Sequence, residues 1–159
     1  MNPIRIITPS GPDQLPLADL LHLWNEGYTQ QIVYPDLATF RAYLDGLKNQ
    51  KHYFLVDPQD HIQGWTFSFD RENERWFALI VSENHQGQGY GRLLLDTLKA
   101  SESILHGWVV DHPNDKRANG QPYRSPLAFY RKCGFEVLTD LRLETGHISA
   151  VKIRWVRDC

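Results

Sequence analysis

Hydrophobic residues in the first half of the chain recur at spacings that predict a strand, two helices and three more strands. Strand patterns cover residues 4–8, 52–56, 62–69 and 76–81, and the last is an unbroken apolar run, typical of a strand buried on both faces. Asp13 and Asp36 are placed to begin the two helices, and Gly27 to end the first. Their apolar faces are formed by Leu17, Leu20, Leu21 and Trp24, and by Leu37, Phe40, Leu44 and Leu47. Turns at residues 57–60 and 70–73 join the last three strands into a meander.

The second half alternates helix and strand patterns. A helix with Gly91, Leu94, Leu95 and Leu98 on one face precedes a strand at residues 104–110 and a long polar loop at residues 111–124. Ser125 as N-cap and Pro126 in the first turn begin a helix that Gly134 ends. Strands at residues 135–143 and 148–155 pair across residues 145–147. The predicted order is β-α-α-β-β-β-α-β-α-β-β.

Length and composition indicate one globular domain over residues 1–159. The formal charge of −2 argues against a field that attracts nucleic acid or an anionic membrane surface. The N-terminus lacks an apolar run long enough for a signal peptide or a membrane span, so we expect a cytoplasmic protein. Cys133 and Cys159 form no disulfide framework, and the seven histidines lack metal-binding spacing, which predicts no metal site.

Three alternating glycines lie between the strand at residues 76–81 and the helix that follows it. Gly87, Gly89 and Gly91 can adopt positive φ, so that backbone N–H groups converge on an anion at the positive end of the helix dipole. A nucleoside-triphosphate loop would continue with Lys and Ser or Thr, whereas Arg92-Leu93 follows here. A dinucleotide loop spaces its glycines two and three apart, whereas these are two and two apart. A glycine-rich turn with a purely structural role is the remaining alternative.

Two blocks of sequence resemble the GNAT N-acetyltransferase superfamily. Gln86, Gly89 and Gly91 match its acetyl-CoA pyrophosphate loop, Arg/Gln-x-x-Gly-x-Gly/Ala, and residues 127–135 are similar to its FYxxxGF helix. The order of predicted elements is also that of the family, so the resemblance extends over nearly the whole chain. It implies an α/β (mixed α+β) fold with a single mixed, twisted sheet of about seven strands and helices on both faces. It also implies that two parallel strands, at residues 76–81 and 104–110, splay apart around the pantetheine arm of the cofactor.

The resemblance implies roles for particular residues, with acetyl-CoA as co-substrate. Backbone groups of Leu79, Ile80 and Val81 would bind pantetheine, and an N–H near Leu79 would polarise the thioester carbonyl. Tyr130 matches the tyrosine that protonates the CoA thiolate, a role that suits a phenol with an ordinary pKa of about 10. Arg92 either adds charge near the phosphates or is simply exposed. The pyrophosphate would be held by Gln86, Gly87, Gln88, Gly89, Tyr90 and Gly91.

The general base and the acceptor are less well marked. The family's glutamate position corresponds to Arg75, which leaves the adjacent Glu74 as the candidate base, although its side chain faces the other side of the strand. A frequent family asparagine corresponds to Tyr123. Residues 111–124 form either an acceptor-binding lid or a mobile connection. Other candidates are Asp70, Glu72, Asp111 and His112 for the base, and Asn114 and Asn119 for the asparagine.

We therefore expect transfer of an acetyl group from acetyl-CoA to a primary amine by direct attack in a ternary complex. The alternative is a non-catalytic acyl-CoA-binding protein with the same fold. The acceptor is expected to be a small-molecule or peptide amine rather than nucleic acid or a membrane component. Family members often dimerise, so a homodimer stays open.

Overall fold

The computed structural model describes residues 4–9, 15–28, 33–112, 116, 120, 125–145 and 148–157. Its strands form a seven-stranded sheet in the order β1-β2-β3-β4-β5-β7-β6. Neighbouring strands are antiparallel except β4 and β5, which are parallel. The strands are β1 (Arg5–Ile7), β2 (Lys48–Val56), β3 (Ile62–Arg71), β4 (Glu74–Val81), β5 (Ile104–Val109), β6 (Glu136–Glu144) and β7 (Ser149–Val156). The predicted mixed sheet and the order of elements are confirmed.

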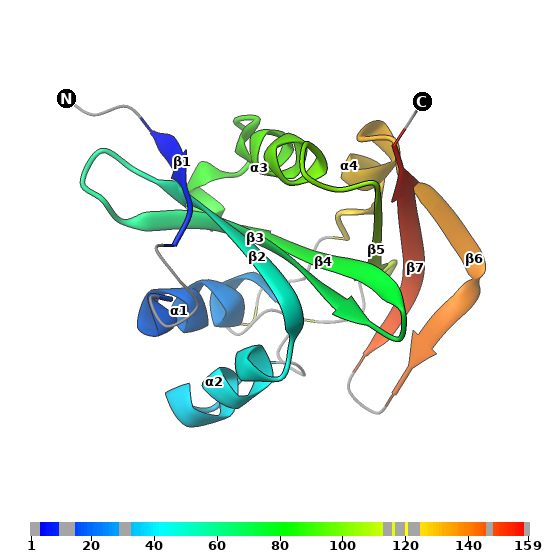
Figure 1. The fold of residues 1–159 in the computed structure, drawn as a ribbon, viewed down its shortest axis with the longest axis horizontal. Helices are drawn as coiled ribbons and strands as arrows, with labels where there is room; N and C mark the ends of the chain where they lie inside the picture. Colours follow the sequence, from blue (N-terminus) through cyan, green and yellow to red (C-terminus); the bar gives the residue numbers. More distant parts are fainter. Residues whose placement is uncertain are drawn as a thin grey trace.

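Helices cover both faces of this sheet (Figure 1). On one face lie α1 (Leu17–Gly27) and α2 (Leu37–Asp45), and on the other lie α3 (Tyr90–Lys99) and α4 (Leu127–Lys132). A short 3-10 helix, η3 (Glu83–His85), follows β4. The two-sided arrangement explains why β4 is apolar from Trp76 to Val81. Trp76 and Ile80 pack in the core beneath α1 and α2, whereas Phe77 packs in the core beneath α3 and α4.

The helix ends agree with the sequence in part. Asp36 caps α2, because its Oδ1 accepts a hydrogen bond from the Thr39 N–H at 2.8 Å. Gly134 follows α4 with φ of 90°, as expected for a helix-ending glycine. Pro126, not Ser125, is the N-cap of α4, and the Ser125 Oγ accepts a hydrogen bond from the Leu127 N–H at 3.3 Å. Asp13 lies outside the described residues, and α1 is described from Leu17.

The meander differs from the expectation at two places. β2 begins at Lys48 rather than residue 52, because Lys48 pairs with Asp70 on a longer β3. The turn expected over residues 70–73 contains only Glu72 and Asn73, whose φ values of 52° and 64° suit a two-residue hairpin of type I′. Arg71 is therefore the last residue of β3 and pairs with Glu74.

Candidate active site

β4 and β5 separate almost as soon as they meet. They share one paired position, Trp76 with His106, while β4 stays paired with β3 as far as Val81. Beyond Trp76, the edge of β4 that faces β5 therefore has no strand partner among the described residues. The expected splay between the two parallel strands is confirmed.

The hydrogen-bond register identifies which backbone groups face this gap. The Ser82 N–H donates to the Gln63 carbonyl at 2.8 Å, and hydrogen-bonded pairs alternate along an antiparallel ladder. Ile80 is thus bonded to β3, whereas the N–H and C=O groups of Leu79 and Val81 point away from β3. Of the three residues expected to bind pantetheine through their backbones, Leu79 and Val81 have the required direction and Ile80 does not.

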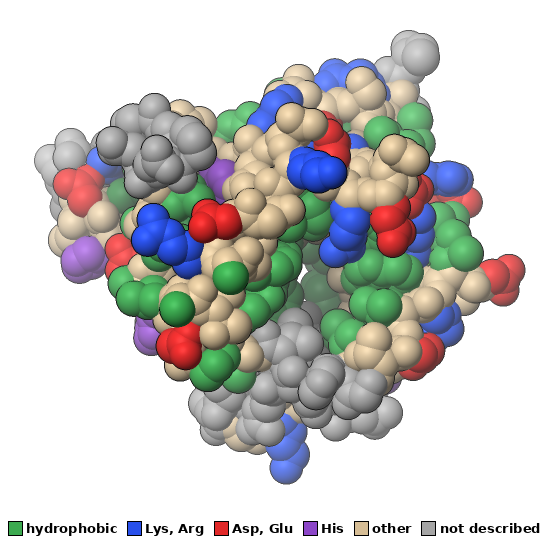
Figure 2. Space-filling view, turned by 60° about the horizontal axis from the view of Figure 1, so that its bottom comes forward, with side chains coloured by type: hydrophobic (Ala, Val, Ile, Leu, Met, Phe, Trp, Pro, Cys, Tyr) green, Lys and Arg blue, Asp and Glu red, His purple; other side chains and the backbone are tan. Residues whose placement is uncertain are grey.

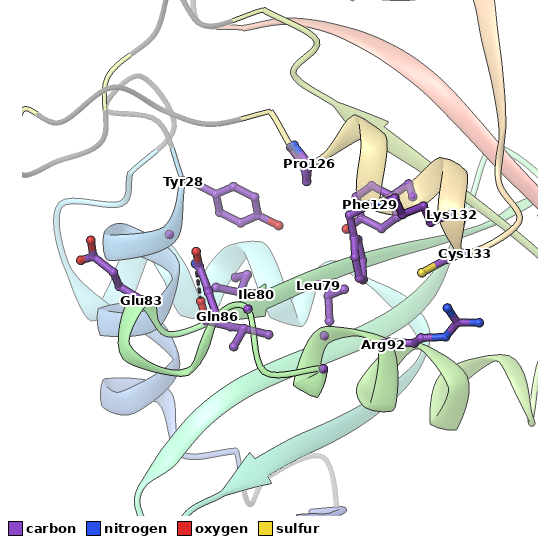
Figure 3. Close-up of a pocket in the computed structure, with 16 residues that line it drawn as sticks. Tyr28, Leu79, Ile80, Glu83, Gln86, Arg92, Pro126, Phe129, Lys132 and Cys133 are labelled. Carbon is purple, nitrogen blue, oxygen red and sulfur yellow. Dashed lines mark hydrogen bonds between the residues drawn. The ribbon is translucent and has the colours of Figure 1, made fainter.

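A cavity of about 770 Å³ begins at this gap and is bounded by β4, the glycine loop, α3 and α4 (Figure 3). Eight of the ten predicted cofactor residues line this cavity, and Gln88 and Tyr90 do not. The eight are Leu79, Ile80, Val81, Gln86, Gly87, Gly89, Gly91 and Arg92.

The glycine loop presents a row of unbonded N–H groups. Gly87 and Gly89 have φ values of 75° and 85°, and Gly89 is the N-cap of α3. Within the described part of the chain, no N–H group from Gly87 to Arg92 donates a hydrogen bond, and the first intrahelical bond runs from the Leu93 N–H to the Gly89 carbonyl. Such a row at a helix N-terminus forms an anion-binding site.

The glutamine side chains in this loop hold it together. The Gln86 Nε2 donates to the Val81 carbonyl at 3.0 Å (Figure 3), and the Gln88 Nε2 donates to the Asn84 carbonyl at 3.0 Å. Gln86 therefore fastens the loop to the end of β4. This role differs from a direct phosphate contact. It also occupies the Val81 carbonyl, so that of Leu79 and Val81 only Leu79 keeps both backbone groups available.

Charge around the cavity is mainly positive. Arg92 and Lys132 line it from α3 and α4, and Glu83 lines it on the opposite side (Figure 3). Arg92 lies 3.9 Å from Asp96, a distance that leaves an exposed pair weak. Lys132 was not predicted from the sequence, because its position in the second motif is a variable one. Two cations beside the loop suit a diphosphate.

A second cavity of about 330 Å³ adjoins the first one. It is lined by aromatic and apolar side chains from both sides of the gap, including Trp24, Tyr43, Phe69, Trp76 and Trp108. Four residues line both cavities: Tyr28, Leu79, Pro126 and Tyr130. Figure 2 shows a hollow near the middle of the face that α1 and α2 border, walled mainly by hydrophobic side chains. The four shared residues mark the boundary between the two cavities.

Tyr130 comes from α4 and is buried, with 6% of its surface exposed. Its ring packs edge-on against Phe77, Phe129 and Phe135 at 5.2–5.7 Å between ring centres. This packing fixes the ring on the wall between the cavities, and its role as an acid stays a prediction. Tyr28 follows the end of α1, and Figure 3 shows its hydroxyl directed into the first cavity. It was not predicted as a site residue, because the sequence pattern marks it only as the residue after a helix.

Glu74 lines neither of these cavities. Its carboxylate accepts hydrogen bonds from the Lys152 Nζ at 2.9 and 3.1 Å and lies 3.2 Å from the His106 Nε2. The hydrogen bond from Lys152 lowers the pKa of Glu74, which makes the carboxylate a weaker base. Arg75, at the family's glutamate position, is on the opposite face, where its guanidinium bonds the buried Glu102.

The other candidates for the base are engaged elsewhere or exposed. Arg142 donates to both Asp111 oxygens at 2.8 and 3.1 Å, which lowers the pKa of that carboxyl. Asp70 accepts hydrogen bonds from Asn49 and Arg75. Glu72 is exposed in the turn between β3 and β4, and His112 lines neither cavity. Asn114, Asn119 and Tyr123 lie outside the described residues.

Residues 49–137, more than half of the chain, match the model of the acetyltransferase (GNAT) domain. The chain belongs to the GNAT acetyltransferase family. It is therefore an acyltransferase, and the resemblance seen in the sequence is confirmed. No curated protein sequence matches the chain.

Solved structures of acetyltransferases have the same fold. A putative acetyltransferase from Acinetobacter baylyi is 12% identical with a TM-score of 0.71, and 98% of this chain and 93% of that chain are covered. The putative acetyltransferase yncA from Salmonella typhimurium, solved with acetyl-CoA, is 14% identical with a TM-score of 0.68, with 99% and 95% covered. A phosphinothricin acetyltransferase from Sinorhizobium meliloti, in complex with acetyl-CoA, is 13% identical with a TM-score of 0.65, with 98% and 89% covered.

The residues that the structure describes contain no group of three or more His, Cys, Asp or Glu side chains arranged to hold a metal ion. None of the described helices is long and apolar enough to cross a membrane.

Proposed function

We propose that this GNAT protein transfers an acetyl group from acetyl-CoA to a primary amine by direct attack in a ternary complex. The observation that carries the proposal is the unbonded N–H row of the glycine loop, which leads along the open edge of β4 to the wall shared with a second cavity. A donor bound along this edge and an amine in the second cavity would meet at Leu79 and Tyr130.

The donor would be held by groups with distinct tasks. The N–H groups of Gly87 through Arg92 suit the diphosphate, with Arg92 and Lys132 adding charge. The backbone groups of Leu79 can hydrogen-bond the pantetheine arm, which would lie along the edge of β4 as an added strand would. Orienting the thioester in this way replaces a collision between two free molecules with a reaction at a fixed distance.

In the chemical step, the amine nitrogen attacks the thioester carbonyl carbon, and the carbon–sulfur bond breaks. The Leu79 N–H is directed into the gap and would stabilise negative charge on the carbonyl oxygen. Tyr130 would donate its phenolic proton to the sulfur as the thiolate leaves. The attacking amine must also lose a proton. Glu74 is five residues before Leu79, about 16 Å along a strand, so the proton would reach it through water.

Release of CoA in the presence of a panel of amines tests this proposal, with wild type compared with Tyr130→Phe. We expect turnover to fall by about 100-fold or more, since general acid catalysis contributes at least that much, while acetyl-CoA affinity stays close to that of wild type. Tyr53→Phe is the matched control, because Tyr53 lines neither cavity and bonds Ser101 instead. Undiminished turnover in Tyr130→Phe would remove this residue from the mechanism.

One observation favours the alternative of a non-catalytic acyl-CoA-binding protein. The candidate base is tied to Lys152, and the described lining of the second cavity contains no carboxylate or imidazole. Tight binding of acetyl-CoA in calorimetry, with no turnover of any amine, would support this alternative. Absence of binding would contradict both functions.

A further inference from the structure

The second cavity has the chemistry of a selective pocket. Its described lining is aromatic or apolar except for one charged side chain, Arg71. Five of its aromatic residues are almost completely buried, with 3–7% exposed, namely Trp24, Phe69, Trp76, Phe77 and Tyr130. A pocket of about 330 Å³ with this lining fits a compact molecule that carries an apolar body.

Arg71 lies at one end of the pocket because the short turn at Glu72 and Asn73 places it last in β3. Its guanidinium carbon is 4.6 Å from the ring centre of Trp76 and 5.3 Å from that of Phe69. Among the described residues it has no ion-pair partner, in contrast to Arg75, Arg142 and Arg154. Stacking fixes the guanidinium in place and leaves its N–H groups available for an anion.

A second hydrogen-bond donor is located beside it. The Trp76 Nε1 is buried and has no hydrogen-bond partner, which is costly for an indole N–H. Lys152 also lies on this side of the sheet, with its Nζ 5.1 Å from the Trp76 ring centre, but Glu74 neutralises it. Arg71 is therefore the cation at this end of the pocket that has no ion-pair partner among the described residues.

The distance from this end to the reaction centre constrains the ligand. Trp76 and Leu79 are three residues apart on β4, which is about 10 Å along a strand. An anionic group at Arg71 and an amine at Leu79 would therefore be separated by several bonds, more than in an α-amino acid. The aromatic walls between them indicate an apolar spacer.

We propose, on the basis of the proposed function, that the acceptor is a primary amine joined to a carboxylate by a compact apolar or aromatic spacer. Arg71 holds the carboxylate, and the amine is delivered beside Leu79 and Tyr130. Polycationic amines fit poorly, because the described lining has no acidic side chain and Arg71 already covers the Phe69 and Trp76 faces with positive charge.

The test compares kcat/KM for four probe amines at saturating acetyl-CoA. 4-(Aminomethyl)benzoate and benzylamine share one body and one amine and differ only in the carboxylate; L-phenylalanine holds its carboxylate too close to its amine, and spermidine is polycationic. We expect 4-(aminomethyl)benzoate to exceed each of the others by at least about tenfold, mainly through a lower KM. In Arg71→Gln the ratio to benzylamine should fall to about one, and Arg71→Lys should restore part of it.

The controls separate this inference from the function on which it rests. Arg41→Gln changes an exposed arginine of α2 that lines neither cavity, and it should keep the wild-type ratio. Turnover of benzylamine, phenylalanine or spermidine as fast as that of 4-(aminomethyl)benzoate would overturn the inference and leave the acetyltransferase intact. Retention of the ratio in Arg71→Gln would overturn it as well. Lack of acetyl-CoA binding, or of any turnover, would remove the function and the inference together.

Discussion

Gly89→Ala tests whether the glycine loop must keep its left-handed conformation to bind CoA. Gly89 has φ of 85° and ψ of 1° as the N-cap of α3. A Cβ added at this position would meet no atom within 4 Å, so the cost is confined to the backbone. Alanine in this region costs about 1–2 kcal/mol.

The free protein can relax away from this conformation, whereas binding through the N–H row would require it. The cost is then paid on binding, and CoA affinity should fall by about 5- to 30-fold. Calorimetric titration with CoA measures this loss. Gly46→Ala is the control, because Gly46 has φ of −79° and an added Cβ would lie an ordinary 3.6 Å from its nearest neighbours. An unchanged affinity in Gly89→Ala would show that the ligand does not depend on this loop conformation.

Two predictions concern stability. Burial lowers the pKa of His52 from 6.5 to about 4, so the folded chain holds it neutral while the unfolded chain binds a proton. The free energy of unfolding should therefore fall by about 2–3 kcal/mol as the pH drops from above 6.5 to 4.5. Urea unfolding at a series of pH values should show a weaker pH dependence in His52→Gln, and equal pH dependence in both proteins would contradict this. Glu102→Ala removes the buried carboxylate that bonds the Arg75 guanidinium and leaves Arg75 with only the more exposed Asp70, so urea unfolding should report a loss of about 3 kcal/mol. Glu136→Ala removes one partner of the exposed ion pair with Arg154 and should change the free energy of unfolding little. A similar loss in both variants would refute the distinction between a buried and an exposed pair.

The order of elements was predictable because each one has a local signal. These signals act over a few positions, and the structure contains the elements that they predict. Examples are the alternating apolar residues of β3, the Asp36 cap of α2 and the glycines at the start of α3. Element ends were less predictable, since partner strands decide them. Lys48 to Lys51 read as polar residues, yet pairing with β3 draws them into β2.

The cofactor side of the candidate site was also largely predictable, because its residues are continuous in sequence. The second cavity was not, since α1, α2, α4, four strands and the segments between them contribute to it and no short motif unites them. Arg71 was expected inside a turn, and only the narrower hairpin places it at the end of β3. Likewise, the register with β3 shows that the backbone N–H and C=O groups of Ile80 point away from the gap, which no pattern of side chains could indicate.

The central claim is that the N–H groups from Gly87 to Arg92 bind the diphosphate of CoA. Amide proton and nitrogen-15 NMR shifts of these residues, followed during a titration with CoA, test it most directly. The structure predicts saturable downfield shifts of these amide protons, with one molecule of CoA bound per chain, and no comparable change at Gly46. Saturation by CoA with these amides unmoved, or with the shifts located elsewhere, would contradict the claim.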